Sequence, residues 1–329
     1  MADVNEASTG SGTEALPDEQ AVAMRKAVRL NWISILVLAL TVALVGVVAG
    51  QSQAMKTAWY EDLLSFLPPI AFLVATRVIK RRPDAEHPYG HHRAIGVGHV
   101  VAASALLAMG TFLILGAVSN LINQEKPPIG TVVLFGHSVW LGWLMVAALV
   151  ITGIPPIFIG RLKQRLAEPL HDKVLYSDAD MNKANWMTSL STIIGVLGIG
   201  VGWWWMDAVA AIIVALSIVR DGVSNLRTAI RDLTDARATD LDGNKEPCIA
   251  TIEETAHNVG WVEEAAARVR DEGHVFHVEL FAVPREGQDP TVEQIRELRN
   301  VLHQLSFRVH DVVVAPVHSI PVYLREEDR

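Results

Sequence analysis

The sequence predicts a membrane-embedded, all-α bundle of six helices followed by a small α+β domain. The first observation behind this prediction is composition: 50% of the 329 residues are hydrophobic, and a mean hydropathy of +0.28 is rare among soluble domains. The second is a series of long apolar stretches, and the third is a change to alternating, strand-like patterns after about residue 246.

Six apolar stretches reach or approach the roughly 20 residues that cross about 30 Å of hydrocarbon. They cover residues 30–50, 59–78, 94–122, 131–159, 185–203 and 206–219. We therefore expect a transmembrane domain over residues 23–222 and a linker over 223–245. The polar residues 1–22, rich in Gly, Ser, Thr and Glu, are expected to form a disordered tail.

Basic residues fix the expected orientation of these spans. Lys and Arg gather before the first stretch and after the second, fourth and sixth, whereas the opposite side has only Lys56 and Lys126. Because positive charge is retained on the cytoplasmic side, both termini should be cytoplasmic. We expect an integral protein of a bacterial plasma membrane.

The C-terminal segment reads as helix, strand, strand, helix and strand over residues 246–324, with a short tail at 325–329. This order suits two helices packed on one sheet. Residues 246–329 contain 16 acidic and 8 basic residues. So acidic a surface argues against nucleic acid as a partner.

Several classes of site are excluded by the residues present. The single cysteine, Cys248, leaves no intrachain disulfide framework and no multi-cysteine zinc site. The sequence has no His-Glu-x-x-His, Gly-x-Ser-x-Gly or phosphate-loop motif. We therefore predict that the protein is not an enzyme.

The loop "DAEHPYGHHR" after the second stretch carries the clearest metal-binding pattern. Asp84, His87 and His91 are spaced by three and four residues, which would place them on one face if the segment is helical at its start. One carboxylate and two imidazoles suit a borderline divalent cation such as zinc. The alternative is a polar loop with solvated histidines.

Three segments, "HPYGHHRA", "SDADMNKANWMTS" and "WWWMDAVAAIIVALSIVRDG", together with the six expected spans, resemble the cation diffusion facilitator family of divalent metal/proton antiporters. The resemblance covers about residues 25–324. It implies a homodimer with ferredoxin-like cytoplasmic domains that exports metal in exchange for protons. It also implies that Asp84, His87 and His91 form a loop metal site that helps to order the transporter.

In this family the second and fifth spans each offer two metal ligands four residues apart. By resemblance, the first pair falls on Glu61 and Ser65, with Asp62 one step away, and the second pair falls on Met181 and Asn185. His or Asp usually fills the first position of the second pair and Asp the second, so this chain departs from the pattern. Helical spacing places Asp178 on the same face as Met181 and Asn185, where it could supply the missing carboxylate.

Two questions stay open at this stage. The first concerns the transported metal. A transport site of carboxylates and Asn without His favours iron or manganese, but zinc is the commonest substrate of the family, so we rank zinc first. Glu61 and Asp62 could also be ordinary acidic residues at a helix N-terminus. The competing hypothesis is a non-transporting metal-sensing or scaffold dimer whose transport site has degenerated to Met181 and Asn185.

Overall fold

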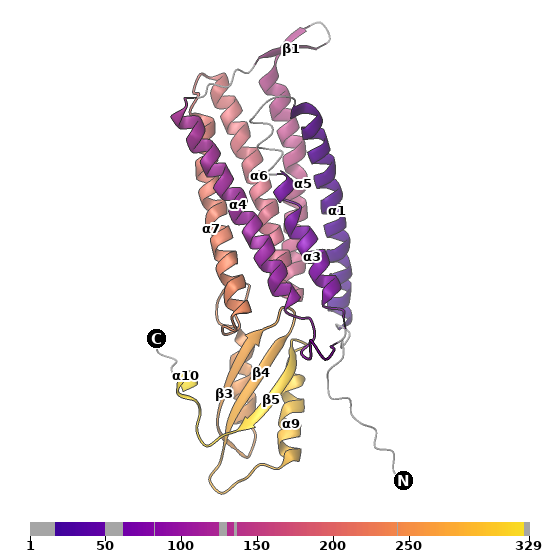
Figure 1. The fold of residues 1–329 in the computed structure, drawn as a ribbon, viewed down its shortest axis with the longest axis vertical. Helices are drawn as coiled ribbons and strands as arrows, with labels where there is room; N and C mark the ends of the chain where they lie inside the picture. The colour runs from indigo at the N-terminus through magenta and orange to yellow at the C-terminus, as the bar shows by residue number, and fades with distance from the viewer. Residues whose placement is uncertain are drawn as a thin grey trace.

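The computed structural model describes residues 17–49, 62–81, 83–124, 130–134, 137–241 and 243–325. An upright bundle of long helices stands on a small α+β domain (Figure 1). The helices of the bundle are α1 (Asp18–Ala49), α3 (Leu67–Val78), α4 (Ala94–Ile122), α5 (Leu141–Leu170), α6 (Lys173–Gly200) and α7 (Met206–Leu233).

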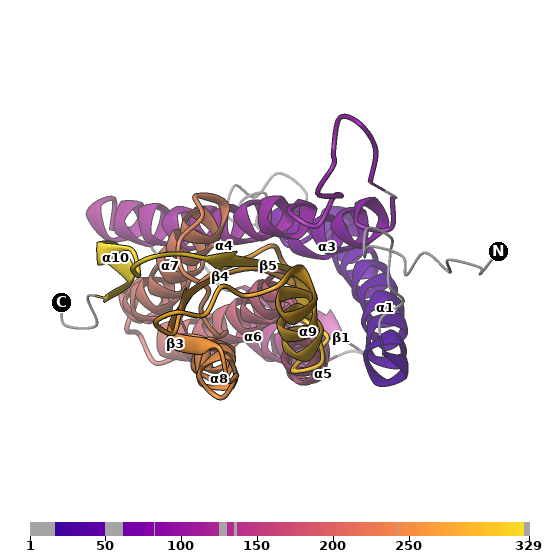
Figure 2. The same cartoon turned by 90° about the horizontal axis from the view of Figure 1, so that it is seen from below.

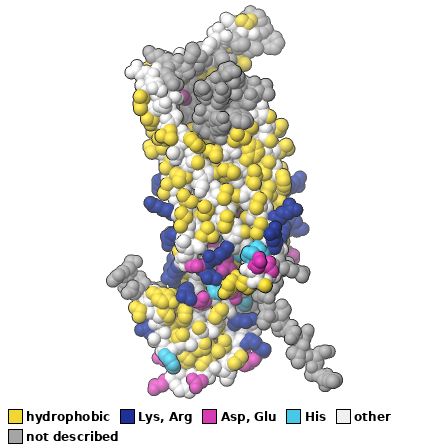
Figure 3. Space-filling model, viewed as in Figure 1, with side chains coloured by type: hydrophobic (Ala, Val, Ile, Leu, Met, Phe, Trp, Pro, Cys, Tyr) yellow, Lys and Arg dark blue, Asp and Glu magenta, His cyan; other side chains and the backbone are white. Residues whose placement is uncertain are grey.

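The helical bundle has the surface of a membrane domain. Hydrophobic side chains cover the middle of the visible face, and Lys and Arg gather at its lower end, beside the α+β domain (Figure 3). Within the described residues, three helical segments are long and apolar enough to cross a bilayer: Asp18–Ala43, Ala94–Ile122 and Gly142–Leu170. The prediction of a helical transmembrane domain is confirmed.

The ends of the helices differ from the expected spans. An antiparallel hairpin of β1 (Thr131–Leu134) and β2 (His137–Trp140) occupies the start of the fourth expected span, so α5 begins and ends about ten residues later. β-branched residues at three of the four β1 positions favour this strand.

Capping residues set two other helix starts. Helix α6 begins at Lys173 because the Asp172 side chain accepts a hydrogen bond from the Leu175 N–H. Helix α1 begins at Asp18, within the expected tail. The negative charges of Asp18 and Glu19 in its first turn interact favourably with the positive end of the helix dipole. Helix α7 continues to Leu233 and so takes up the first half of the expected linker.

The second span is interrupted where the sequence places two prolines. Residues 62–64 form a short helical turn, and α3 starts again at Leu67 with Pro68 and Pro69 in its first turn. Proline is tolerated there because the first N–H groups of a helix have no partner within the helix. Glu61 lies outside the described residues.

The C-terminal region has the expected order of elements and a mixed three-stranded sheet. It contains α8 (Pro247–His257), β3 (Val262–Asp271), β4 (Phe276–Pro284), α9 (Val292–His303), β5 (Val309–Pro316) and the short α10 (Val322–Arg325). Strand β4 lies in the centre, antiparallel to β3 and parallel to β5. Apolar residues of α8 and α9 pack on the sheet in one core, including Ile249, Ile252, Leu280, Leu298 and Leu302. The prediction of a small α+β domain is confirmed.

The α+β domain is pressed closely against the base of the bundle. Seen from below, its sheet and helices lie under α4, α6 and α7 (Figure 2). The turn between β3 and β4 contains Gly273, whose φ of +103° favours glycine. A Cβ atom on Gly273 would lie 2.7 Å from Cβ of Ile95 in α4, so the close approach also requires glycine.

Candidate metal sites

The structure brings the three predicted loop ligands together. One ligand atom from each of Asp84, His87 and His91 lies within 4.8 Å of the others, and no other such group of three occurs among the described residues. Oδ1 of Asp84 accepts hydrogen bonds from the N–H groups of Glu86 (3.0 Å) and His87 (2.7 Å). The His87 and His91 rings stack with centroids 4.4 Å apart. The backbone turn therefore fixes the carboxylate close to both imidazoles.

The chemistry of this cluster fits a divalent metal. The N–H of His87 donates to Asp84 and holds the pKa of this exposed carboxyl below its usual range, so it stays ionised. Nδ1 of His91 is buried without a hydrogen-bond partner among the described residues. A buried nitrogen without a partner is uncommon in a folded protein, and a metal ion could use its lone pair.

The same loop lies against the α+β domain. The Tyr89 ring meets the edge of the His277 ring at 6.4 Å, and the Arg270 guanidinium lies 5.9 Å from the Tyr89 ring centroid. His92 approaches His310 at 5.4 Å between ring centroids. Burial of the His92 ring, with His310 close by, lowers the pKa of His92 to about 4, so this residue is neutral at physiological pH. Tyr89 and His92 thus hold the loop against the α+β domain, while the cluster residues Asp84 and His87 stay exposed.

Within the bundle, the second and fifth spans meet at Ser65 and Asn185. The Ser65 hydroxyl donates to Oδ1 of Asn185 over 3.2 Å, joining the segment before α3 to α6. Ser65 is buried and Asn185 is half-buried. Asp62 is half-buried three residues before Ser65. Ser65 and Asn185 are the part of the expected transport site that the described residues bring into direct contact.

Two other expected ligands have different surroundings. Met181 is buried in an apolar cluster of α4, α6 and α7 with Leu106, Met109 and Ile218. Asp178 is buried, and its Oδ2 lies 2.6 Å from Nζ of Lys163 in α5. Both residues are buried in the bundle. The partner of Asp178 is Lys163, whereas Asn185 is bonded to Ser65.

Lys163 follows the fourth expected span, which ends at residue 159, so it counts among the basic residues that predict a cytoplasmic loop. A signal in the sequence could have placed it correctly. Lys163, Ala167 and Leu170 are spaced as one helix face, and all three are buried. The neighbouring Arg161 and Arg165 lie on the exposed side.

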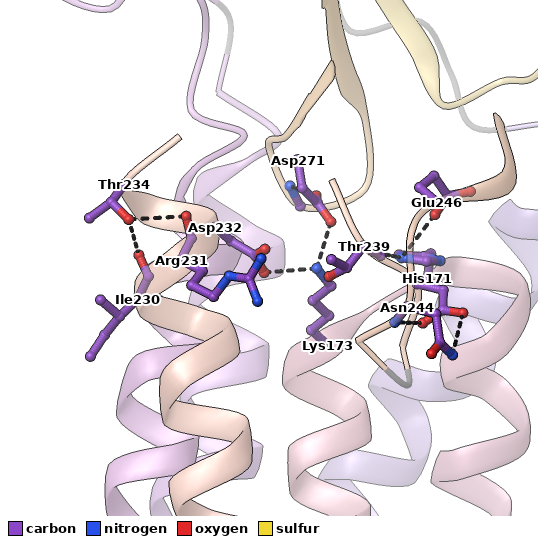
Figure 4. Close-up of polar contacts among 12 residues, drawn as sticks. His171, Lys173, Ile230, Arg231, Asp232, Thr234, Thr239, Asn244, Glu246 and Asp271 are labelled. Carbon is purple, nitrogen blue, oxygen red and sulfur yellow. Dashed lines mark hydrogen bonds and ion pairs between the residues drawn. The ribbon is translucent and has the colours of Figure 1, made fainter. Parts of the chain in front are cut away.

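A second polar cluster joins the α+β domain to the bundle (Figure 4). Nζ of Lys173, at the start of α6, lies 2.8 Å from Oδ2 of Asp232 and 2.9 Å from Oδ2 of Asp271. Next to it, Nε2 of His274 lies 2.6 Å from Oδ2 of Asp172. Asp271 and His274 flank the β3–β4 turn, so this turn contacts the start of α6 directly and is connected to α7 through Lys173.

The turn between α5 and α6 completes this contact. His171 has a left-handed backbone, and its Nε2 lies 3.4 Å from the Thr239 carbonyl and 3.9 Å from a Glu246 carboxylate oxygen. Burial and the nearby Arg308 lower the pKa of His171 to about 4, so its ring is neutral. The cations that face the carboxylates of this cluster are Lys173 and Arg308, and the Arg308 guanidinium lies 3.3 Å from Glu246 and 3.7 Å from Asp271.

Comparison with known proteins identifies a family. The model of the cation efflux transmembrane domain matches residues 30–234. The manganese efflux system proteins MneS and MneP of Bacillus subtilis are 23% and 21% identical, over 82% and 83% of this chain and 87% and 88% of their own lengths. Metal tolerance protein C1 of Arabidopsis thaliana is 26% identical over 64% of this chain and 45% of its own.

Proposed function

Because the chain belongs to the cation efflux family, we propose that it exports a divalent transition metal from the cytoplasm in exchange for protons. This proposal has six spans, formed by α1, by α3 together with the residues before it, and by α4, α5, α6 and α7. The ferredoxin-like domain and both termini then lie in the cytoplasm. The Lys and Arg side chains at the lower end of the bundle support this orientation. A homodimer in a bacterial plasma membrane is the proposed assembly.

The observation that carries the proposal is the contact between Ser65 and Asn185. Polar side chains inside a bundle at membrane depth are costly and mark ion pathways by default. This pair joins the two helices that bear the transport ligands in the family. We propose that metal binds there, with Asp62 and Glu61 supplying negative charge. Deprotonated carboxylates bind metal and release it when they are protonated, which couples export to proton entry.

We propose manganese as the preferred substrate, with iron second and zinc third. A serine hydroxyl, an amide oxygen and carboxylates are hard ligands that suit Mn²⁺. The sulfur of Met181, which would favour a softer ion, belongs to a residue of the apolar cluster with Leu106 and Met109. Two relatives are named as manganese efflux proteins, which supports the same choice.

One observation favours the alternative of a non-transporting, metal-binding dimer. Asp178 is paired with Lys163, and Met181 packs among apolar residues, so few ligands remain beside Ser65 and Asn185. A protein of this kind would keep the loop site and the α+β domain but would not move metal.

Flux through the purified protein separates the two functions. In proteoliposomes with an imposed pH gradient, we expect uptake of Mn²⁺ that stops when the gradient is collapsed. Ser65→Ala combined with Asn185→Leu should abolish uptake. Thr111→Ala is the matched control, because the exposed Thr111 hydroxyl donates to the Leu107 carbonyl of its own helix. No uptake by the unmodified protein with Mn²⁺, Fe²⁺ or Zn²⁺ would support the alternative.

A further inference from the structure

A buried ion pair lies inside the bundle, below the proposed transport position. The ammonium of Lys163 is 2.6 Å from Oδ2 of Asp178 and donates to the hydroxyl of Ser34 over 3.0 Å. Lys163, Asp178 and Ser34 are 0%, 1% and 2% exposed, respectively. The three residues come from α5, α6 and α1, so this contact joins three helices.

Neither charge could remain in this place alone. Removing an ion from water costs several kcal/mol, and only a close partner of opposite charge offsets this cost. The carboxylate of Asp178 therefore requires a cation, and in this chain the cation is covalently attached. A divalent metal ion and the Lys163 ammonium would compete for the same oxygen atoms.

Asp178 is also too far along α6 to share an ion with Asn185. The two residues are seven apart, which is about 10 Å at 1.5 Å per residue. Metal–oxygen bonds are only about 2.0–2.6 Å long. An ion at Asp178 would consequently occupy a second position, on the cytoplasmic side of the contact between Ser65 and Asn185.

We infer that Lys163 is a specificity-determining residue whose ammonium takes the place of a metal ion at Asp178. It limits the bundle to one metal position, at Ser65 and Asn185, and withdraws Asp178 from the set of metal ligands. The inference rests on the proposed function for the identity of the competing ion. It assigns a role to a lysine that charge counting alone would place in a cytoplasmic loop.

The number of bound metal ions tests this inference. The full chain carrying His87→Ala and His91→Ala, which removes the loop site, is purified and dialysed against Mn²⁺, and the bound metal is measured by elemental analysis. Adding Lys163→Met should increase binding by one ion per chain. Lys163→Arg, which keeps the charge, should not, and neither should Lys163→Met combined with Asp178→Asn. Equal binding by all these variants would overturn the inference.

If Lys163→Met weakens the fold, its unfolding temperature with and without Mn²⁺ provides a second test. Mn²⁺ should raise the unfolding temperature of that variant by replacing the lost charge. It should have no such effect when Asp178→Asn is also present. If Mn²⁺ fails to stabilise or refold Lys163→Met while the double variant is stable, the pair is purely structural. Failure of both variants to fold in Mn²⁺ also counts against the inference, because a metal ion should substitute for the ammonium.

These measurements are independent of transport. Absence of Mn²⁺ flux through the unmodified protein would reject the proposed function but would leave the ion count in Lys163→Met valid. An unchanged ion count would reject the role of Lys163 and leave the flux result untouched.

Discussion

His274 of the β3–β4 turn lies with its Nε2 atom 2.6 Å from Oδ2 of Asp172, the residue that caps α6. Both side chains are buried, and the other carboxylate oxygen of Asp172 accepts the Leu175 N–H at 2.9 Å. The Asp172 carboxylate thus caps α6, the helix that bears Asn185, and also contacts His274 of the α+β domain. The α+β domain and the N-terminus of α6 are therefore anchored by the same carboxylate.

Replacement of Asp172 should weaken both functions of this carboxylate. We expect Asp172→Ala to destabilise the protein by about 3 kcal/mol, because it leaves His274 without its partner and removes the helix cap. Asp172→Asn keeps an acceptor for the cap and should cost about half as much. Unfolding temperatures in detergent measure the difference, and equal losses for the two variants would show that only the charge matters.

The packing of α4 against α7 gives a second prediction. A Cβ atom on Gly222 would lie 2.8 Å from the backbone N and Cα atoms of Leu107, which cannot move aside as a side chain can. Gly222→Ala should therefore destabilise the bundle by about 1–3 kcal/mol. Gly116→Ala is the control, since a Cβ atom there meets no atom of the described residues within 4 Å and alanine favours a helix. A stabilising Gly222→Ala would contradict the close helix contact.

The stability of the α+β domain should depend on pH through His277 and Asp311, whose side chains lie 2.6 Å apart. The hydrogen bond to Asp311 raises the pKa of His277 above 6.5, and the same bond lowers the pKa of Asp311 below 3.8. The contribution of His277 is complete below pH 6.5 and is lost as the pH rises through its raised pKa. The contribution of Asp311 is lost only as the pH falls through its lowered pKa.

We accordingly expect the unfolding temperature of the full chain to fall as the pH is raised from about 6 to 9. His277→Gln should reduce this fall, whereas His318→Gln, at an exposed histidine, should leave it unchanged. An identical pH dependence in the His277 variant would show that other groups cause it.

Local patterns in the sequence were sufficient for the loop cluster and for the order of elements in the α+β domain. Asp84, His87 and His91 lie within eight residues, so one backbone turn brings their ligand atoms within 4.8 Å. Each of the strands β3, β4 and β5 coincides with an alternating or apolar run of the sequence. Thr291 and Gln294 form a capping box at the start of α9. Such features depend only on residues that are near one another in the chain.

Contacts between distant segments could not be predicted in the same way. Ser65 and Asn185 are 120 residues apart, and only family resemblance placed them in one site. The sequence did not reveal Lys163 as the partner of Asp178, because the β1–β2 hairpin occupies the first residues of the fourth apolar stretch. Helix α5 therefore begins and ends about ten residues later than expected. That shift places Lys163 inside the bundle, where pairing with Asp178 offsets part of the cost of burying its charge.

Loss of the loop ligands should reduce retained metal without abolishing the fold. We expect His87→Ala or His91→Ala to weaken metal binding at the loop by at least about 10–100-fold, since even residues that only support metal ligands have effects of that size. Glu86→Gln is the matched control, because only the backbone N–H of Glu86 contacts Asp84. Metal content after gel filtration measures the loss, and full retention in both histidine variants would reject a metal site in this loop.

The proposed transport position makes its own prediction about Asn185. Replacing the neutral amide by a carboxylate in Asn185→Asp adds negative charge beside Ser65, and the charge of the ligands sets the affinity for a divalent cation. We expect the KM for Mn²⁺ to fall about 10-fold, with a lower maximal rate because metal is released more slowly. Asn123→Asp, exposed at the end of α4, adds the same charge away from the site and should change neither value. An unaltered KM in Asn185→Asp would mean that metal does not pass between Ser65 and Asn185.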